Sequence, residues 1–257
     1  MKIHSTAIVG KNVVLGENVR VGPWCVIEDG VRIASGTILE GNVFIGRGTR
    51  IGKNNKIHRF ATLGTAPQDL KYGGEATYLE IGDNNIIREY VNISRGTSET
   101  WMTKLGDNNL VMAYCHIAHD CYIGNAVILT NATNIAGHVH IKDFATIGGI
   151  VAVHQFTKIG EYAMVGAGSK IVKDIVPFAL ATGIPAKIKG MNIIGLKRRG
   201  FPKEEIEIIK KCFNILFRSS YNTHQAIEKI KAELPMDKNI KLIIDFIENE
   251  AKRGIAK

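Results

Sequence analysis

The chain has 257 residues, of which 45% are hydrophobic and 22% are charged, and its 33 basic and 24 acidic side chains give a formal net charge of +9. These are ordinary globular values and exclude a disordered chain. No apolar run approaches the roughly 20 residues of a membrane helix, and the first residues lack the apolar core of a signal peptide. We therefore expect a soluble, cytoplasmic protein without stable membrane insertion.

A six-residue period runs through the first two thirds of the chain. From Ile3 to Ile171, every sixth residue is Ile, Leu or Val at 26 of 29 positions. Neither a helical period nor plain strand alternation explains this spacing. One short strand and one turn per repeat do explain it, and three repeats close a triangular coil with the aliphatic side chains inside. The period predicts a left-handed parallel β-helix of roughly nine coils, stacked about 4.8 Å apart.

A second inward position lies two residues before each aliphatic one and carries small or branched side chains. Cys25, Cys115 and Cys121 fall in this slot. Because no CxxC pair is present, we expect the cysteines to be buried free thiols rather than metal ligands or redox pairs. A glycine often follows the aliphatic residue, and we interpret it as the residue that a tight corner requires. These glycines are Gly10, Gly16, Gly22, Gly46, Gly52, Gly64, Gly82 and Gly106.

The period is interrupted at residues 65–80 and 95–104 and resumes in register after each interruption. Both segments are predicted to be loops that project from the prism, and long loops on a rigid scaffold are commonly functional. The exposed coil ends and flat faces would also favour a closed cyclic oligomer.

Beyond residue 171 the period fades, and from Pro202 it becomes helical. Three helices are predicted: one that opens at Pro202, one capped by Thr223 and one capped by Asp237. The predicted domains are therefore a β-helix at 1–190 and a small helical domain at 191–257. Residues 186–257 hold 16 basic and 9 acidic side chains, a net +7. This excess suits an acidic protein, a phosphate-bearing ligand, nucleic acid or an anionic surface.

Four histidines fall near one edge of the predicted prism, on neighbouring coils: His116, His119, His138 and His154. Asp120 follows His119 directly. A histidine oriented by a carboxylate can act as a general base. A metal site is the alternative, but we expect none, because these residues are predicted to be spread along the prism.

At this point the chain resembles a known family. The motifs are HIAHDCYIGN (116–125), NIAGHVHI (134–141), VAVHQF (151–156), PQDLKY (67–72) and GLKRRGF (195–201). They resemble the UDP-N-acetylglucosamine O-acyltransferases of lipid A biosynthesis, and the resemblance covers nearly the whole chain. It implies transfer of an R-3-hydroxyacyl group from acyl carrier protein to the glucosamine 3-hydroxyl, by a homotrimer with sites between subunits and without a cofactor.

The resemblance also implies roles for individual residues. His119 matches the catalytic base, Asp120 its orienting partner, and the Gly137 N–H the oxyanion donor. Ala167 matches the position that sets acyl length. The positions that match substrate contacts are His116, His138, His154 and Gln155, Gln68, Asp69 and Lys71 on the first loop, and Asn192, Arg198 and Arg199 near the nucleotide.

Two positions depart from the family pattern. Ser94 stands where the family commonly has histidine in a stretch like VNIHRGT, and Ile194 stands where it has a sugar-contacting glutamate. An apolar residue there removes a hydrogen-bond acceptor for a sugar donor group. Some members of the family resemble acyltransferases of 3-amino-3-deoxy sugars, so the resemblance also implies such a UDP-sugar as the alternative substrate.

Other functions remain in competition. A later N-acyltransferase of the same pathway usually has an extra N-terminal uridine-binding domain, which we do not expect here because the repeats begin at Ile3. A sugar or serine O-acetyltransferase is a more distant alternative. A scaffold that binds nucleic acid through its basic tail should show aromatics among the charges, whereas Phe213, Phe217 and Phe246 read as helix core. We therefore expect no nucleic-acid partner.

Overall fold

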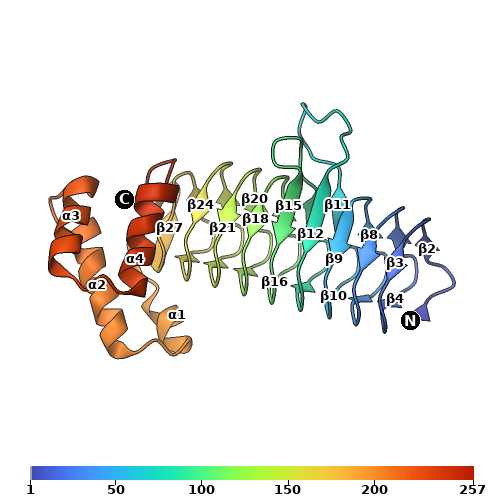
Figure 1. Ribbon diagram of the computed structural model, residues 1–257, viewed down its shortest axis with the longest axis horizontal. Coiled ribbons are helices and arrows are strands. Elements are labelled where there is room, and N and C mark those ends of the chain that lie inside the picture. Colours follow the sequence, from blue (N-terminus) through green and yellow to red (C-terminus); the bar gives the residue numbers. More distant parts are fainter. Residues whose placement is uncertain (1) are drawn as a thin grey trace.

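The computed structural model describes residues 2–257. The chain forms an elongated three-sided prism of short strands, with helices gathered at its C-terminal end (Figure 1). Each side of the prism is one sheet, and apart from a closing hairpin every pairing is parallel. The predicted left-handed parallel β-helix with a helical C-terminal part is confirmed.

The three sheets contain 11, 9 and 8 strands. In spatial order, the first consists of β1 (Lys2–Ile3), β4 (Arg20–Val21), β7 (Ile38–Leu39), β10 (Lys56–Ile57), β13 (Ile86–Ile87), β16 (Leu110–Val111), β19 (Ile128–Leu129), β22 (Thr146–Ile147), β25 (Met164–Val165), β27 (Ala179–Gly183) and β28 (Ala186–Met191). The second consists of β2 (Ile8–Val9), β5 (Val26–Ile27), β8 (Phe44–Ile45), β11 (Thr62–Thr65), β14 (Asn92–Ser94), β17 (His116–Ile117), β20 (Asn134–Ile135), β23 (Ala152–Val153) and β26 (Lys170–Ile171). The third consists of β24 (Lys158–Ile159), β21 (His140–Ile141), β18 (Tyr122–Ile123), β15 (Met102–Leu105), β12 (Tyr78–Ile81), β9 (Thr49–Ile51), β6 (Arg32–Ile33) and β3 (Val14–Leu15).

The core consists of the inward aliphatic residues, stacked from coil to coil. Ile117 pairs with Ile135, 18 residues further along, and both are fully buried. The first coil is the exception, since Ile3 and Val9 remain 39% and 37% exposed. They lie at the open end of the prism, where no preceding coil covers them.

Glycine is required at the repeat positions for a reason other than the predicted one. The left-handed backbone conformation at the corners is mostly adopted by other residues, such as Asn54 and Tyr114. Of the eight repeat glycines, only Gly64 has a positive φ. Gly22 and Gly46 are required instead because a Cβ would lie 1.8 Å and 2.2 Å from a carbonyl oxygen of the next coil. The constraint is close coil stacking.

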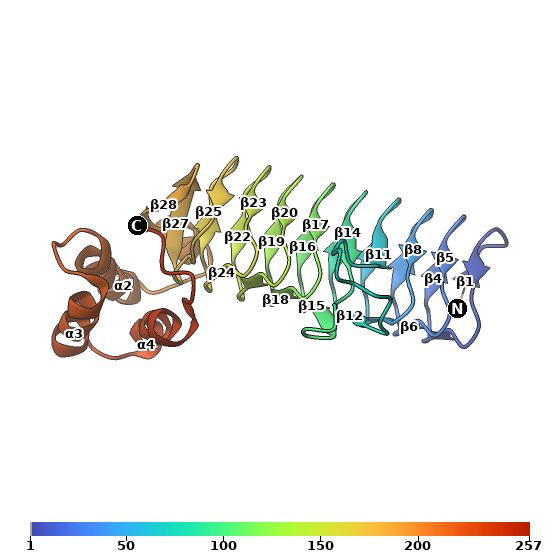
Figure 2. The same cartoon turned by 90° about the horizontal axis from the view of Figure 1, so that it is seen from above.

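Both predicted loops are present but shorter than expected. Residues 66–77, the first loop, connect β11 to β12, and residues 95–101, the second loop, connect β14 to β15. Strands β12 and β15 therefore take up the last residues of each predicted loop. These two strands pair over Tyr78–Ile81 and Met102–Leu105. The chain therefore rejoins the third sheet about three residues, half a repeat, before the predicted end of each loop. The two loops project from the middle of the prism, as Figures 1 and 2 show.

The antiparallel hairpin β27–β28 closes the prism, and the helices follow it. They are α1 (Ile193–Arg198), α2 (Lys203–Phe217), α3 (Thr223–Glu233), α4 (Lys238–Asp245) and a π-helical turn, η1 (Phe246–Glu250). The sequence prediction missed α1, which Asn192 caps. It also named the wrong cap for α3, since Asn222 rather than Thr223 accepts from the Gln225 N–H. Asp237 caps α4 as predicted.

The helical part is tied back to the prism by buried and charged contacts. The carboxylate of buried Asp174 accepts the N–H groups of Lys158 at 2.7 Å and Arg253 at 2.9 Å. Lys142 forms an ion pair with Glu250 at 2.8 Å.

Nowhere in residues 2–257 is a helix both long and apolar enough to cross a membrane.

Candidate active site

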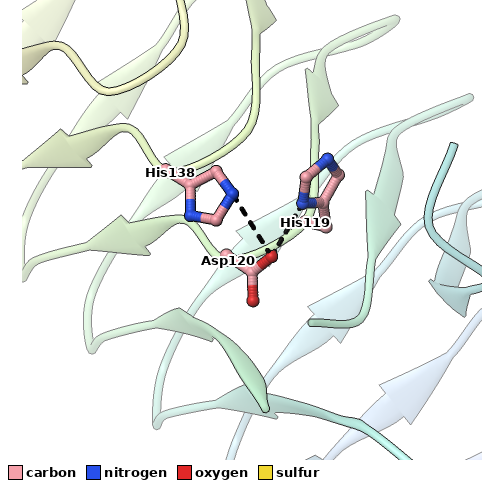
Figure 3. Close-up of side chains that lie close together, drawn as sticks. All are labelled: His119, Asp120 and His138. Atoms are coloured by element: carbon pink, nitrogen blue, oxygen red, sulfur yellow. Dashed lines mark hydrogen bonds and ion pairs between the residues drawn. The ribbon is translucent and has the colours of Figure 1, made fainter. Parts of the chain in front are cut away.

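His119, Asp120 and His138 meet at one corner of the prism, where the second sheet turns into the third. His119 and Asp120 follow β17, and His138 occupies the same corner one coil further on. The His138 N–H donates to the His119 carbonyl at 3.1 Å, so stacking of the coils brings side chains 19 residues apart together. Figure 3 shows both imidazoles directed at one oxygen of Asp120.

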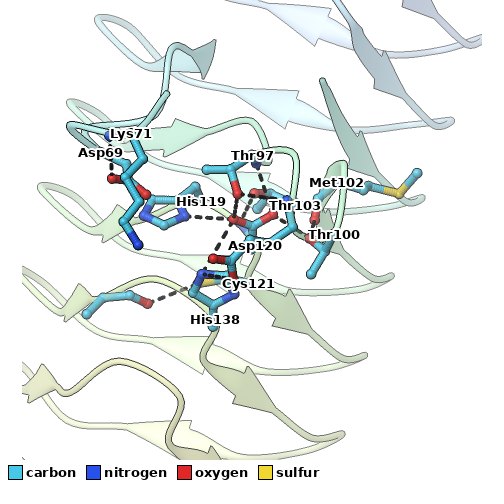
Figure 4. Close-up of polar contacts among 12 residues, drawn as sticks. Asp69, Lys71, Thr97, Thr100, Met102, Thr103, His119, Asp120, Cys121 and His138 are labelled. Atoms are coloured by element: carbon cyan, nitrogen blue, oxygen red, sulfur yellow. Dashed lines mark hydrogen bonds and ion pairs between the residues drawn. The ribbon is translucent and has the colours of Figure 1, made fainter. Parts of the chain in front are cut away.

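The Asp120 carboxylate is completely buried and is held by four donors. Oδ2 accepts from His119 Nδ1 at 2.7 Å and from Thr97 Oγ1 at 2.7 Å, while Oδ1 accepts from the Thr97 N–H at 2.9 Å and from the Thr100 hydroxyl. The Asp120 N–H donates to Thr103 Oγ1 at 2.8 Å. Figure 4 shows this network, to which the second loop contributes Thr97 and Thr100.

These contacts determine the charge of Asp120 and the tautomer of His119. Burial raises the pKa of Asp120, but the hydrogen bonds from Thr100, His119 and Thr97 outweigh it and leave the pKa below its ordinary value. An ionised carboxylate can only accept, so Nδ1 of His119 carries the proton. The lone pair of Nε2 is then free to take a proton from a substrate.

Gly137 lies directly against the His119 ring. A Cβ at this position would be 2.7 Å from Cε1 and 2.9 Å from Nε2 of His119, so only glycine lets the ring lie here undisturbed. No acceptor within residues 2–257 takes up the Gly137 N–H. A free N–H beside the base is what an oxyanion donor requires.

His138 is packed among aromatic and acidic groups. Its ring stacks on Phe156 at 4.5 Å and lies edge-on to His119 at 5.2 Å. Nε2 lies 3.7 Å from Asp120 Oδ2 and 3.5 Å from Glu99 Oε2 on the second loop. Neither Glu99 nor the threonines of this loop are among the site residues predicted from the sequence. The available signal was that the loop rejoins the β-helix one coil before His119.

His116 and His154 lie on the same edge but outside this contact group. His116 Nδ1 is 2.8 Å from Asn92 Oδ1. Burial and then the neighbouring His119 lower the pKa of His116, which favours a neutral ring. His154 and Gln155 are exposed on the coil after His138, and His154 Nδ1 bonds to the Gln155 carbonyl.

Among the predicted first-loop residues, Gln68 and Lys71 are exposed. The Asp69 carboxylate accepts the Lys71 N–H at 2.9 Å, so it shapes the loop itself. Ser94, on β14, is 1% exposed, and its hydroxyl has no partner among the described residues.

Arg198 and Arg199 line a cavity of about 890 Å³ on another side of the prism, over the first sheet. Ile194 also lines it. The Arg199 guanidinium lies 4.7 Å from the centre of the Phe144 ring. The side chain of Asn192 is already committed, since it accepts from the Gly195 N–H at 3.1 Å and donates to the Tyr162 carbonyl at 2.9 Å.

Ala167 is exposed in the turn after β25. It is not among the residues that line the 890 Å³ cavity, although Met164 of the same strand is.

The expectation that the histidines are too spread out for a metal is wrong for two of them. One ligand atom each from His119, Asp120 and His138 lies within 4.8 Å of the others. Stacked coils bring residues of neighbouring turns as close as strands in a sheet. However, both Asp120 oxygens already accept two hydrogen bonds each, and a cation would have to displace donors. The arrangement is better suited to proton transfer.

The cysteines are not placed as nucleophiles. All four are buried, as predicted. Burial raises the pKa of Cys115 and raises that of Cys121 to about 12. Both thiols therefore stay protonated near neutral pH, although Cys121 is next to Asp120 in sequence.

Comparison with known proteins identifies the relatives of this chain. Residues 6–41 and 102–137 match the model of bacterial transferase hexapeptides, and residues 174–256 match the second domain of UDP-N-acetylglucosamine O-acyltransferase. The chain is 45% identical to the acyl-[acyl-carrier-protein]--UDP-N-acetylglucosamine O-acyltransferase of Thiobacillus denitrificans (99% of each chain) and 50% identical to that of Thermodesulfovibrio yellowstonii (100% and 99%).

Solved structures give the same result. The UDP-N-acetylglucosamine acyltransferase of Bacteroides fragilis superimposes with a TM-score of 0.97 at 43% identity, over 99% of this chain and 100% of that one. Its counterpart from Acinetobacter baumannii also scores 0.97, at 44% identity and with both chains fully covered. The chain thus belongs to the UDP-N-acetylglucosamine O-acyltransferase family.

Proposed function

We propose that this chain transfers an R-3-hydroxyacyl group from acyl carrier protein to the 3-position of UDP-N-acetylglucosamine, the first step of lipid A biosynthesis. The observation that carries the proposal is the His119–Asp120 pair, whose free Nε2 lies against Gly137, a residue with an N–H that has no acceptor among residues 2–257. Full-length relatives at 45–50% identity bear the name of this activity. The proposal places the chain in the cytoplasm.

In the proposed mechanism the sugar hydroxyl attacks the thioester directly. His119 Nε2 takes the hydroxyl proton as the oxygen attacks, and Asp120 stabilises the imidazolium that forms. The Gly137 N–H stabilises the oxyanion. The C–S bond then breaks, and the sulfur of the carrier protein leaves as a thiol with the proton that His119 returns, which regenerates the base. A thioester is reactive enough for this step, so the mechanism requires neither a covalent enzyme intermediate nor a cofactor.

The nucleotide half of the substrate is assigned to the cavity that contains Arg198 and Arg199. Two guanidinium groups suit a diphosphate. Ile194 lines the same cavity and is 67% exposed. It offers no hydrogen-bond acceptor where the family has a sugar-contacting glutamate, and because of this departure a 3-amino-3-deoxy UDP-sugar is the second candidate substrate.

Turnover with defined substrates tests the proposal. The purified chain is mixed with R-3-hydroxyacyl carrier proteins of several chain lengths and with either UDP-N-acetylglucosamine or its 3-amino analogue. We expect acylated UDP-N-acetylglucosamine as product. If only the amino sugar is acylated, the proposed reaction stands but its sugar substrate is the 3-amino analogue. If neither sugar is acylated, acyl transfer is refuted.

A homotrimer is the expected assembly. The His119–Asp120 pair, called the dyad below, lies at the corner between the second and third sheets. The residues that line the 890 Å³ cavity belong to the first sheet and to α1 with its flanking residues. A second subunit would bring a cavity to each dyad. Sedimentation at micromolar concentration should give three times the 28.2 kDa chain mass. A fully active monomer would contradict this expectation.

Acyl carrier protein is expected to be acidic, and the basic tail should speed its encounter with the enzyme. Residues 187–203 contain six basic residues and no acidic one. The proposed surface consists of Lys197, Arg198, Arg199, Lys210, Lys211 and Arg218.

Raising salt should lower kcat/KM for acyl carrier protein, because the Debye length falls from about 10 Å at 0.1 M to about 3 Å at 1 M. A pantetheine thioester without the protein is the control. If its kcat/KM falls as steeply, the tail does not steer a protein partner.

A further inference from the structure

The two loops of the site are joined by a hydrogen-bonded side chain. The first loop (66–77) carries the predicted sugar contacts, and the second loop (95–101) carries the threonines that hold Asp120. Arg95, at the start of the second loop, reaches back to the first. None of the roles assigned above uses Arg95.

The Arg95 guanidinium makes contacts that constrain it from several directions. Nη2 and Nε donate to the Tyr72 hydroxyl at 2.9 and 3.3 Å, and Nη1 donates to the Gly64 carbonyl at 2.9 Å. Its central carbon is 5.5 Å from the centre of the Tyr72 ring. The Tyr72 hydroxyl in turn donates to the Glu75 carbonyl at 2.8 Å. A planar guanidinium bound in this way fixes both the ring and the turn that contains it.

The backbone of Arg95 leads directly to the dyad. Its N–H donates to the Thr65 carbonyl at 3.0 Å, and the next N–H, of Gly96, donates to the Tyr78 carbonyl at 3.0 Å. Thr97 follows and binds both Asp120 oxygens. Only one residue separates the Arg95 contacts from those of the carboxylate that orients His119.

We propose that Arg95 and Tyr72 clamp the two loops together, so that Arg95 is a positioning residue that couples the sugar-binding loop to the catalytic dyad. The inference rests on the proposed function, since both loops serve that site. Loss of the clamp should therefore affect the sugar and the chemical step together and leave the binding of the acyl donor unchanged.

The chain offers a matched control. The Arg50 guanidinium also lies 5.5 Å from a tyrosine ring, that of Tyr78, and pairs with Glu80 at 3.4 Å. Arg50 belongs to β9 on the outer face of the third sheet and makes no polar contact with either loop among the described residues. R50Q thus removes the same charge and the same type of stacking without breaking the clamp.

The test compares R95Q, Y72F, the double variant and R50Q by steady-state kinetics. A hydrogen bond from a charged donor corresponds to about tenfold in rate or binding. R95Q should lower kcat/KM for the UDP-sugar about tenfold, through both a lower kcat and a higher KM. KM for acyl carrier protein should stay within about twofold of the wild-type value. Y72F should lower kcat/KM by a smaller factor than R95Q. The double variant should lower it no further than R95Q does, because both substitutions remove the same contact. R95K should not rescue activity, since an ammonium lacks the planar fork.

Hydrogen exchange of the same variants provides a readout independent of turnover. Amide exchange should accelerate in both loops of R95Q and Y72F and stay at the wild-type rate in R50Q. Kinetics of R95Q and Y72F equal to those of R50Q, or faster exchange confined to one loop, would overturn the clamp. A wild-type chain without turnover would instead refute the proposed function, and the exchange result would still decide the contact. If R95Q fails to fold, Y72F carries the same comparison.

Discussion

His119→Ala should lower kcat at least about a hundredfold, because general base catalysis contributes about 10²–10⁴-fold. Loss of the imidazole removes the Nε2 atom that lies against Gly137 and that Asp120 orients through Nδ1. Since His119 is 14% exposed and lies outside the core, we expect the fold and nucleotide-sugar binding to persist. Asp120→Asn should lose less, because the base remains but its ring is no longer held in the right tautomer.

The control for this prediction is provided by the cysteines. Cys115→Ala and Cys121→Ala, measured in the same assay, should retain near-normal kcat, apart from the cost of a small core cavity. A near-normal rate for His119→Ala would contradict the assignment of the base. Trapping of an acylated cysteine would contradict direct attack by the sugar.

Gly137→Ala should reduce kcat by at least about a hundredfold, the usual cost of losing one oxyanion donor. The added methyl group would lie 2.7 Å from Cε1 of His119, closer than carbon atoms can approach. The ring cannot retreat freely, because Nδ1 is bound to Asp120 at 2.7 Å. The single substitution should therefore displace both the base and the N–H. kcat is measured with saturating substrates, and circular dichroism checks the fold.

Gly149→Ala is the matched control for this substitution. It lies in a turn of the next coil, and its added Cβ would approach no atom closer than 3.3 Å. We expect near-wild-type kcat for this variant. Wild-type kcat for Gly137→Ala as well would show that neither close packing against His119 nor the N–H matters for the reaction.

The sequence by itself determined the prism and the pair of residues that carries the proposed chemistry. Each coil buries one aliphatic residue per face, so an aliphatic residue recurs at every sixth position. This period alone predicts that Ile117 and Ile135 lie in the core. His119 and Asp120 are adjacent in the chain, so their association was also visible. The interruptions at the loops were visible because a break in a strict period marks a departure from the core.

Contacts across coils and between loops were decided only by the tertiary structure. Thr97 and Thr100 hold Asp120 from 23 and 20 residues away, and no period links an irregular loop to the carboxylate that it covers. The purpose of the repeat glycines was misread for the same reason, because the distance between stacked backbones is not a property of one repeat. Arg95 looks like a solvated charge in the sequence. Its role depends on Tyr72, 23 residues earlier, which only the folding of both loops onto one corner brings within hydrogen-bonding distance.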